Sequence, residues 1–181
     1  MLGSLIKRKL DADKMANVFV NAFNEVIESG FDEVAEMINE DPAFIDCPQI
    51  NKNYEDAFLM IVLAGNLRFF EDHFSKQEEI EIKQLIKHKF AAIYDMNAGD
   101  FDAILSEYDS FISRVNHPSK NTLYGMSKAV FHKFKLNNFQ EEYFKNLNTP
   151  NPLFLKRMDD IITNFLWDWE QFFKKHKLNI A

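Results

Sequence analysis

Apolar side chains recur at steps of three and four residues along nearly the whole chain, and this spacing constrains the fold most. Nineteen of the 181 residues are phenylalanine, interleaved with isoleucine, leucine and valine. Such spacing places apolar side chains on one face of a helix, segment after segment. The pattern predicts an all-α fold with an aromatic-rich core. A second explanation for the surplus stays open, because AT-rich codons can put Phe where Leu would serve.

The length of the chain limits the expected number of domains, and its net charge limits the classes of partner. One domain over residues 1–181 is expected at this length. The formal net charge of −7 argues against nucleic acid as a partner, because phosphate binding needs a basic footprint. Two short basic runs stand near the ends of the chain and are expected to be solvated helix or tail residues: Lys7-Arg8-Lys9 and Lys174-Lys175-His176-Lys177.

No segment has the character of a membrane anchor. The longest apolar run, Ala57 to Ala64, is too short for a bilayer, which needs roughly 20 residues. Leu2 to Ile6 is too short for the apolar part of a signal peptide, and basic residues follow it instead of preceding it. Cys47 is the single cysteine and fits a reducing compartment. We therefore expect a cytoplasmic protein with no membrane partner.

Capping signals divide the apolar pattern into about seven helices packed as an irregular bundle. The first two are expected at about residues 13–29 and 31–39, with Gly30 supplying the left-handed residue that ends the first. Residues 54–74 contain a run that is apolar on every side and predict the central helix. A buried strand is the competing interpretation, but the Ala, Leu and Met content favours a helix.

Later helix starts carry stronger signals. Ser75 and Glu78 have the spacing of a capping box, which predicts a helix to about residue 97. Gly99 is expected to end it, and the next helix is expected to run to about residue 116. Asn151 followed by Pro152 predicts the start of a long C-terminal helix near 152–177. Further helices are expected at about residues 119–136 and 138–147, and no pair of strands is expected.

One helical pair resembles a tetratricopeptide hairpin. The resemblance rests on Tyr94, Gly99, Phe101, Ala103 and Tyr108. Two of the intervals differ from that family's pattern by one residue, and no fixed period recurs along the chain. We therefore interpret the pair as generic helical-hairpin chemistry, and no family is recognised across the whole chain.

Catalytic and metal-binding motifs are not found. None of the five histidines has a carboxylate three or four residues before it, and no two histidines are three or four residues apart. This argues against the metal sites typical of helical bundles, so no metal and no cofactor are expected, and catalytic residues stay unknown. Ligands gathered from separate helices are the alternative that the sequence leaves open. The histidines are His73, His88, His117, His132 and His176.

Nucleophile and phosphate-loop signals are equally weak. Gly3-Ser4 is the only Gly-Ser pair and has no motif around it. Cys47 is interpreted as a structural cysteine, since a nucleophile needs a base that the fold must bring near. Four acidic side chains are expected to form a solvated helix face: Glu33, Glu36, Glu40 and Asp41.

Trp167 is the candidate interface residue. Trp169 falls in the apolar stripe of the predicted last helix, whereas Trp167 does not. A tryptophan on a polar face either packs on an adjacent element or anchors a partner. The helical neighbours of Trp167 would all be polar, namely Thr163, Asn164, Glu170 and Gln171.

Two classes of function are consistent with these observations. The first is a non-catalytic cytoplasmic protein that acts through protein–protein interaction or self-association. The alternative is a helical bundle that binds a small apolar ligand in a Phe-lined cavity and could also be an enzyme. A large pocket with convergent polar groups would favour the second class, and an apolar surface around Trp167 would favour the first.

Overall fold

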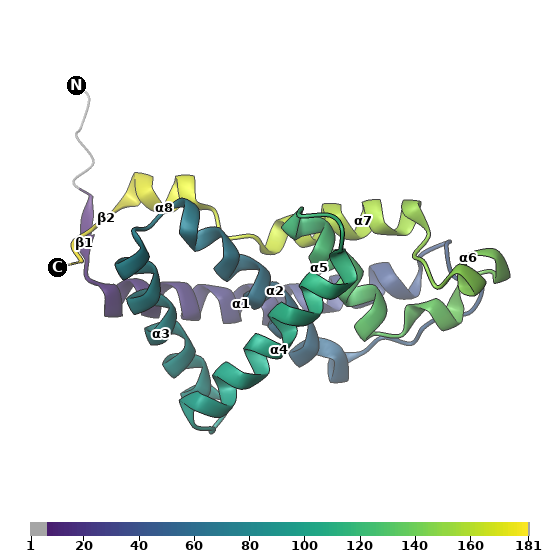
Figure 1. Ribbon diagram of the computed structural model, residues 1–181, viewed down its shortest axis with the longest axis horizontal. Helices are drawn as coiled ribbons and strands as arrows, with labels where there is room; N and C mark the ends of the chain where they lie inside the picture. Colours follow the sequence, from purple (N-terminus) through teal and green to yellow (C-terminus); the bar gives the residue numbers. More distant parts are fainter. Residues whose placement is uncertain (1–6, 181) are drawn as a thin grey trace. The chain divides into compact units, whose positions relative to one another are not determined.

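The computed structural model describes residues 7–180, and most of the described chain is helical (Figure 1). The all-α class predicted from the sequence is therefore confirmed. Leu2 to Ile6 and Gly3-Ser4 lie outside the described residues. The helices are α1 (Ala12–Asn39), α2 (Glu55–Arg68), α3 (Lys76–Ile93), α4 (Ala98–Asn116), α5 (Thr122–Lys133), α6 (Glu142–Leu147), α7 (Pro152–Ile162) and α8 (Trp169–Lys175). Four 3-10 turns join them: η1 (Lys52–Tyr54), η2 (Phe69–Asp72), η3 (Leu136–Phe139) and η4 (Thr163–Phe165).

The chain forms two compact units, which are described separately. Unit 1 contains Met1–Asn24, Phe69–Ala103 and Trp167–Ala181, and unit 2 contains Glu25–Arg68 and Ile104–Leu166. Helices α1 and α4 each continue from one unit into the other. The single domain over residues 1–181 stays a prediction.

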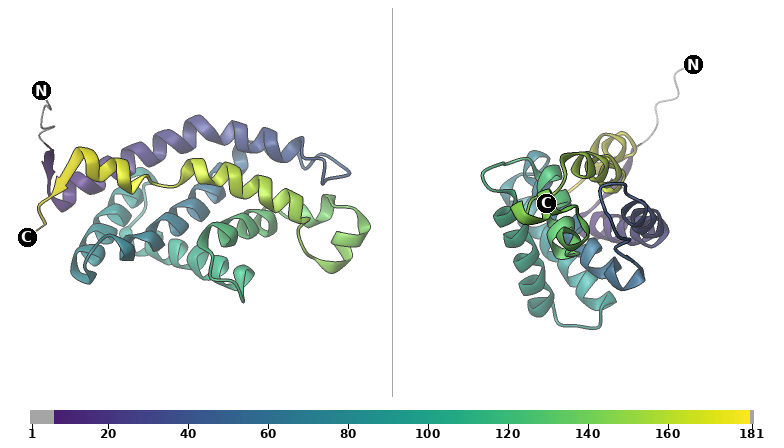
Figure 2. Two further views of the ribbon diagram at one scale, coloured as in Figure 1. Left: turned by 90° about the horizontal axis from the view of Figure 1, so that it is seen from above. Right: turned by 90° about the vertical axis from the view of Figure 1, so that its right-hand side faces the viewer.

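A pair of short strands in unit 1 corrects the prediction that no strands pair. β1 (Arg8–Leu10) and β2 (His176–Leu178) are parallel, with Arg8 beside His176 and Leu10 beside Leu178. The pairing brings the beginning and the end of the described chain together (Figure 2). Leu10 is buried and holds β1 to the unit. Each strand has only three residues, which is too short to show the alternating pattern that predicts a strand.

Aromatic rings that contact one another fill unit 1. Phe19 and Phe23 of α1 stack with their centroids 5.5 Å apart. The Phe90 ring of α3 lies 6.0 Å from Phe23 and 5.8 Å from Phe101 of α4. Aromatic pairs at such distances add to the free energy gained from burial. Packing therefore gives the phenylalanine surplus a structural role.

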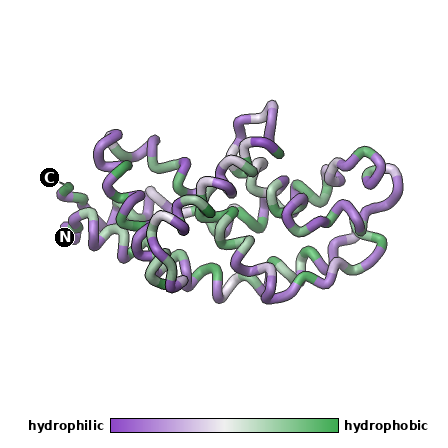
Figure 3. The backbone as a smooth tube through the Cα atoms, turned by 60° about the horizontal axis from the view of Figure 1, so that its bottom comes forward, coloured by the Kyte–Doolittle hydropathy of each residue, from purple (hydrophilic) through white to green (hydrophobic). Residues whose placement is uncertain are grey.

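Helix α2 is the buried element of unit 2 and forms in the segment predicted as the central helix, but it spans residues 55–68 rather than 54–74, because the 3-10 turn η2 follows Arg68. Every residue from Phe58 to Leu67 is buried, which confirms a helix apolar on all sides and rejects the buried strand. A Cβ atom on Gly65 would overlap the side chain of Met126, so α2 and α5 approach closely there. The backbone coloured by hydropathy alternates between apolar and polar residues along the other helices (Figure 3).

The first helix does not end at Gly30, contrary to the prediction. α1 is one helix of 28 residues, and no glycine in the described chain has a positive φ. A Cβ atom at Gly30 would lie 2.9 Å from the Phe165 ring. Glycine therefore stands here to admit that ring, which is a tertiary requirement rather than a helix-ending signal.

Gly99 likewise lies inside a helix rather than ending one. α3 ends at Ile93, and the left-handed residue after it is Asp95, with a φ of 52°. Asp can adopt this conformation, although glycine is the commoner choice. Asn97 then accepts a hydrogen bond from the Asp100 amide at 2.8 Å at the start of α4. The predicted capping box at Ser75 and the predicted end of α4 at residue 116 are both confirmed.

The predicted C-terminal helix is interrupted. It begins at Pro152 with the Asn151 cap, as predicted, but α7 ends at Ile162, and α8 begins only at Trp169. Buried Asn66 of α2 donates a hydrogen bond to the Phe165 carbonyl at 3.0 Å, which fixes the turn between them. The predicted helices at 119–136 and 138–147 are also shorter, as α5 and α6, with η3 between them.

Candidate interaction site

Trp167 lies outside any helix, so its predicted helical neighbours do not surround it. It stands in the extended segment between η4 and α8 and is half-buried. Its ring centroid lies 5.0 Å from that of Phe19 and 5.6 Å from that of Phe172, both in unit 1. Trp169 is 8% exposed, as expected for a core residue. Packing therefore accounts for much of the Trp167 ring, and its role as an interface anchor stays a prediction.

Helix α6 differs from every longer helix in unit 2 because it contributes no buried residue. Its six residues follow Gln140, whose side chain is buried. Tyr143 and Leu147 lie one helical turn apart and are 69% and 58% exposed. The chain thus orders a helix that covers little of the core and shows apolar side chains to solvent. Burial on folding does not explain such an arrangement.

Polar hydrogen bonds, rather than apolar packing, hold the segments around α6. The Gln140 amide nitrogen donates to the Thr149 carbonyl at 2.8 Å, and its amide oxygen accepts from the Asn151 amide at 2.7 Å. Asn137 donates to the Lys145 carbonyl at 3.1 Å. Buried amides that satisfy several backbone groups fix a loop in one conformation. The conformation of α6 and of the turn after it is therefore specified by these two side chains.

The loop after α1 joins the same region. Phe44 forms an isolated β-bridge with Gln140, and the Ile45 amide donates to the Phe139 carbonyl at 2.8 Å. The Phe44 ring lies 5.0 Å from that of Phe154 in α7. Ile45 is itself 70% exposed, and Leu153 at the start of α7 is 63% exposed. We refer to the four exposed side chains of this region as the α6 surface: Ile45, Tyr143, Leu147 and Leu153.

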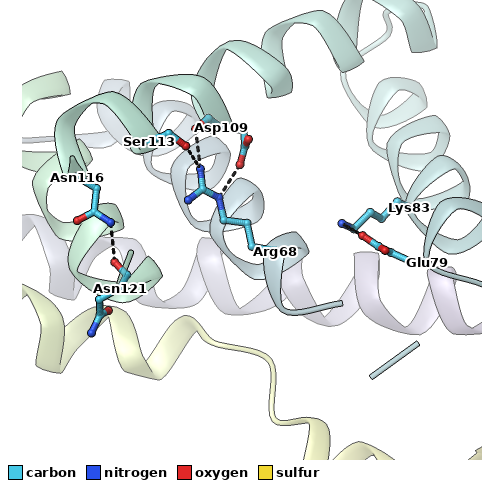
Figure 4. A network of polar contacts seen from close by, with 7 residues as sticks. All are labelled: Arg68, Glu79, Lys83, Asp109, Ser113, Asn116 and Asn121. Carbon is cyan, nitrogen blue, oxygen red and sulfur yellow. Dashed lines mark hydrogen bonds and ion pairs between the residues drawn. The ribbon is translucent and has the colours of Figure 1, made fainter. Parts of the chain in front are cut away.

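Two arginine side chains of unit 2 are paired with aspartates. Arg68 of α2 donates from Nε to Asp109 Oδ1 at 2.6 Å and from Nη2 to the Asp109 carbonyl and Ser113 Oγ, both at 2.7 Å (Figure 4). Arg157 binds both carboxylate oxygens of Asp41, at 2.6 and 2.7 Å. Such bidentate pairs link elements of the fold. The charges of Arg68 and Arg157 are therefore occupied in contacts within the fold.

Asp41 corrects one further prediction. Glu33, Glu36 and Glu40 are exposed, as expected for a solvated helix face. Asp41 is 5% exposed and follows α1, where Arg157 neutralises it. The hydrogen bonds that Arg157 donates to the Asp41 carboxylate raise the pKa of Arg157. The partner residue lies far along the chain, so the sequence offered no signal for this pair.

Two partly buried titratable groups have shifted pKa values, Asp159 and His132. Ser127 of α5 donates a hydrogen bond to Asp159 of α7, and burial raises the pKa of that carboxyl group. Burial also lowers the pKa of His132. Among residues 7–180, no group of three or more His, Cys, Asp or Glu side chains could hold a metal ion. Cys47 is exposed on the loop after α1.

The helix predicted at residues 138–147 carried no indication of which of its side chains stay exposed, so the exposure of Tyr143 and Leu147 was not predicted. One local signal did exist for the interruption beside Trp167. Asp168 and Gln171 have part of the spacing of a helix cap, and Asp168 Oδ1 accepts from the Gln171 amide at 2.8 Å. No helix of the described residues is long and apolar enough to cross a membrane. The chain matches no protein-family model, no curated protein and no solved structure, so a functional assignment rests on its own geometry.

Proposed function

We propose that this chain is a non-catalytic protein that acts by binding another protein through the α6 surface. The observation that carries the proposal is a helix with no buried residue, which follows the buried, hydrogen-bonded Gln140 and displays Tyr143 and Leu147. Exposed apolar side chains that are held rigid are favourable contacts for a partner, because little conformational entropy is lost on binding. Tyrosine is among the residues enriched at such interfaces.

A cytoplasmic location is part of the same proposal. The single cysteine is exposed and has no second cysteine in the chain with which to form a disulfide. The net charge of −7 favours a protein partner over nucleic acid. A second copy of the chain is the competing partner at the α6 surface, and the experiment below distinguishes it by mass.

The ligand-binding alternative rested on the phenylalanine surplus alone. In unit 2 the Phe58 ring lies 5.5 Å from Phe31 and 5.1 Å from Phe165. Rings that contact one another in this way fill space rather than line a cavity. We therefore base the proposal on the α6 surface.

Photo-crosslinking tests the proposal in cells that produce the protein. A benzophenone side chain at position 143 is compared with one at position 93, because Ile93 is 54% exposed on α3 and provides a matched apolar control. We expect one recurrent protein adduct from position 143 and none from position 93. Excess unlabelled protein should suppress the adduct, and the Leu147→Asp variant should not.

Three outcomes contradict the proposal. Equal adducts from both positions, or suppression by both competitors, would show that the α6 surface is not selective. An adduct with the mass of two copies of this chain would show that the α6 surface binds a second copy rather than a different protein. The Leu147→Asp variant is expected to keep its thermal midpoint, since Leu147 is mostly exposed.

A further inference from the structure

Two basic runs from opposite ends of the sequence meet in unit 1. The parallel register places Arg8 of β1 beside His176 of β2, and Lys9 beside Lys177. Lys175 precedes β2 at the end of α8. The two runs lie more than 160 residues apart in the sequence, and they were predicted to be separate solvated helix or tail residues. We refer to the combined residues as the basic strand pair: Lys7, Arg8, Lys9, Lys175, His176 and Lys177.

The register creates a repulsive contact. Side chains of directly opposed residues leave a sheet on the same face, so Lys9 and Lys177 project side by side, and both residues are exposed. Like charges in this position destabilise the pairing of strands. The buried neighbour Leu10 explains why the strands associate. It does not explain why two lysines occupy the outward face, where an anionic ligand would relieve their repulsion.

The positive charge of this region is not neutralised within the described chain. The carboxylates nearest in sequence pair with other lysines: Asp11 with Lys14 at 3.0 Å, and Glu170 with Lys174 at 2.6 Å. Among residues 7–180, no ion pair involves a member of the basic strand pair. A local excess of positive charge on a chain of net charge −7 attracts an acidic ligand.

The sheet also has open edges. Within the described residues it contains only β1 and β2. Each strand therefore has an outer edge of backbone N–H and C=O groups that no third strand covers. An extended peptide can add to such an edge through backbone hydrogen bonds, while its side chains provide the selectivity. Lysines beside an edge discourage indiscriminate pairing, and here they would admit an acidic strand preferentially.

We propose that the basic strand pair binds an acidic, extended segment of a partner protein, which adds to the sheet as a third strand. Its carboxylates would lie against Lys9 and Lys177. Nucleic acid and anionic lipid carry the charge but offer no strand to pair with the edge, so the peptide fits both features. This inference goes beyond the function proposed for the α6 surface, because it concerns the other unit and a different chemistry.

Fluorescence anisotropy on the full chain tests the proposal. The probe is a labelled peptide of alternating glutamate and threonine, and its controls replace every glutamate by glutamine or place two prolines at its centre. The protein is compared with the double variant Lys9→Gln, Lys177→Gln. The matched control is Lys174→Gln, because Lys174 is exposed but already paired with Glu170.

We expect the acidic peptide to bind the unmodified protein and the Lys174→Gln control at least about tenfold more tightly than the double variant. The glutamine and proline peptides should bind weakly to all three proteins. Binding of the acidic peptide should weaken as salt is raised, because exposed charges are screened. The proposal is overturned if the acidic peptide fails to bind, or if the double variant binds it equally well.

Two further arms separate the classes of ligand. Equal binding of the proline-containing peptide would overturn strand addition. Tighter binding of a single-stranded oligonucleotide, or of vesicles containing phosphatidylserine, would overturn the assignment to a peptide. Thermal unfolding supplies an independent readout of the repulsion: the double variant should melt about 1–3 °C higher than the unmodified protein. A lower midpoint would show that the lysines support the fold rather than a ligand.

Discussion

Different interactions stabilise the interior of each unit. Unit 1 relies on rings and a terminal strand pair: Phe70, His73 and Phe74 all lie within 5.3 Å of the Trp169 ring centroid. Unit 2 has a helix buried on all sides, but its loops are fixed by single polar side chains such as Gln140. Apolar packing tolerates substitution when volume is kept, whereas a buried polar group requires its specific partner. Unit 2 should therefore be more sensitive to the loss of individual hydrogen bonds.

The largest effect is expected in the core of unit 2. Leu63 is 0% exposed in α2, so the Leu63→Asp variant would bury a carboxylate without a partner, at a cost of several kcal/mol. That is comparable with the whole free energy of unfolding of a small domain. Circular dichroism should show an unfolded protein. Glu36→Lys, on the exposed face of α1, should stay within about 0.5 kcal/mol, and equal midpoints for the two variants would contradict the placement of the core.

The ring cluster of unit 1 provides the next test. Trp169→Ala should reduce the free energy of unfolding by about 3–5 kcal/mol, because it removes a buried ring that several others contact. Trp167→Ala should cost less, since Trp167 is half-buried. Denaturant unfolding measures both values. If Trp167 is also an interface anchor, its alanine variant should weaken association in sedimentation velocity, and a loss of stability equal to that of Trp169→Ala would refute this role.

Two ion pairs allow a direct comparison of the units, one with a buried carboxylate in unit 2 and one exposed in unit 1. Arg157→Ala would leave Asp41 buried without its partner in unit 2 and should cost about 1–3 kcal/mol. Lys14→Ala removes an exposed pair with Asp11 in unit 1 and should cost much less than Arg157→Ala, because solvent screens exposed charges. Chemical denaturation of both variants measures the difference. Equal costs would mean that burial of Asp41 does not decide the strength of its pair.

The smallest expected effects are opposite pH dependences. Burial raises the pKa of Asp159 in unit 2. The contribution of this group to stability is therefore greatest at low pH, and it is lost as the pH rises from the ordinary Asp pKa to the pKa in the folded protein. The Lys83 hydrogen bond lowers the pKa of Glu79 in unit 1, so its contribution is present above the ordinary Glu value and is lost as the pH falls.

Isosteric amides separate these two contributions. As the pH rises above about 4, Asp159→Asn should gain stability relative to the unmodified protein. As the pH falls below about 4.5, Glu79→Gln should regain stability relative to the unmodified protein. Thermal midpoints recorded from about pH 3 to about pH 6 give the two differences. Parallel trends for the two variants would show that at least one carboxyl group does not titrate as its surroundings require.

Local signals in the sequence predicted much of the helical framework. The capping box at Ser75 and the Asn151 cap before Pro152 both form as predicted. The run in α2 that is apolar on every side proved to be buried throughout. Caps and short-range periodicity depend on contacts within one or two helical turns, so they can be read from neighbouring residues. For the site, the sequence drew attention to Trp167 but not to the α6 surface.

Contacts between distant segments decided the rest. α1 continues through Gly30, which leaves room for the Phe165 ring, and buried Asp41 is paired with Arg157. Gln140 holds a helix that adds nothing to the core. The sequence alone determined where several helices begin, such as α3 after Ser75 and α7 at Pro152, since a cap is a local contact. Contacts between segments distant in the sequence decide which helices are interrupted and which apolar side chains remain exposed. They also place Lys9 beside Lys177. No single segment encodes this proximity.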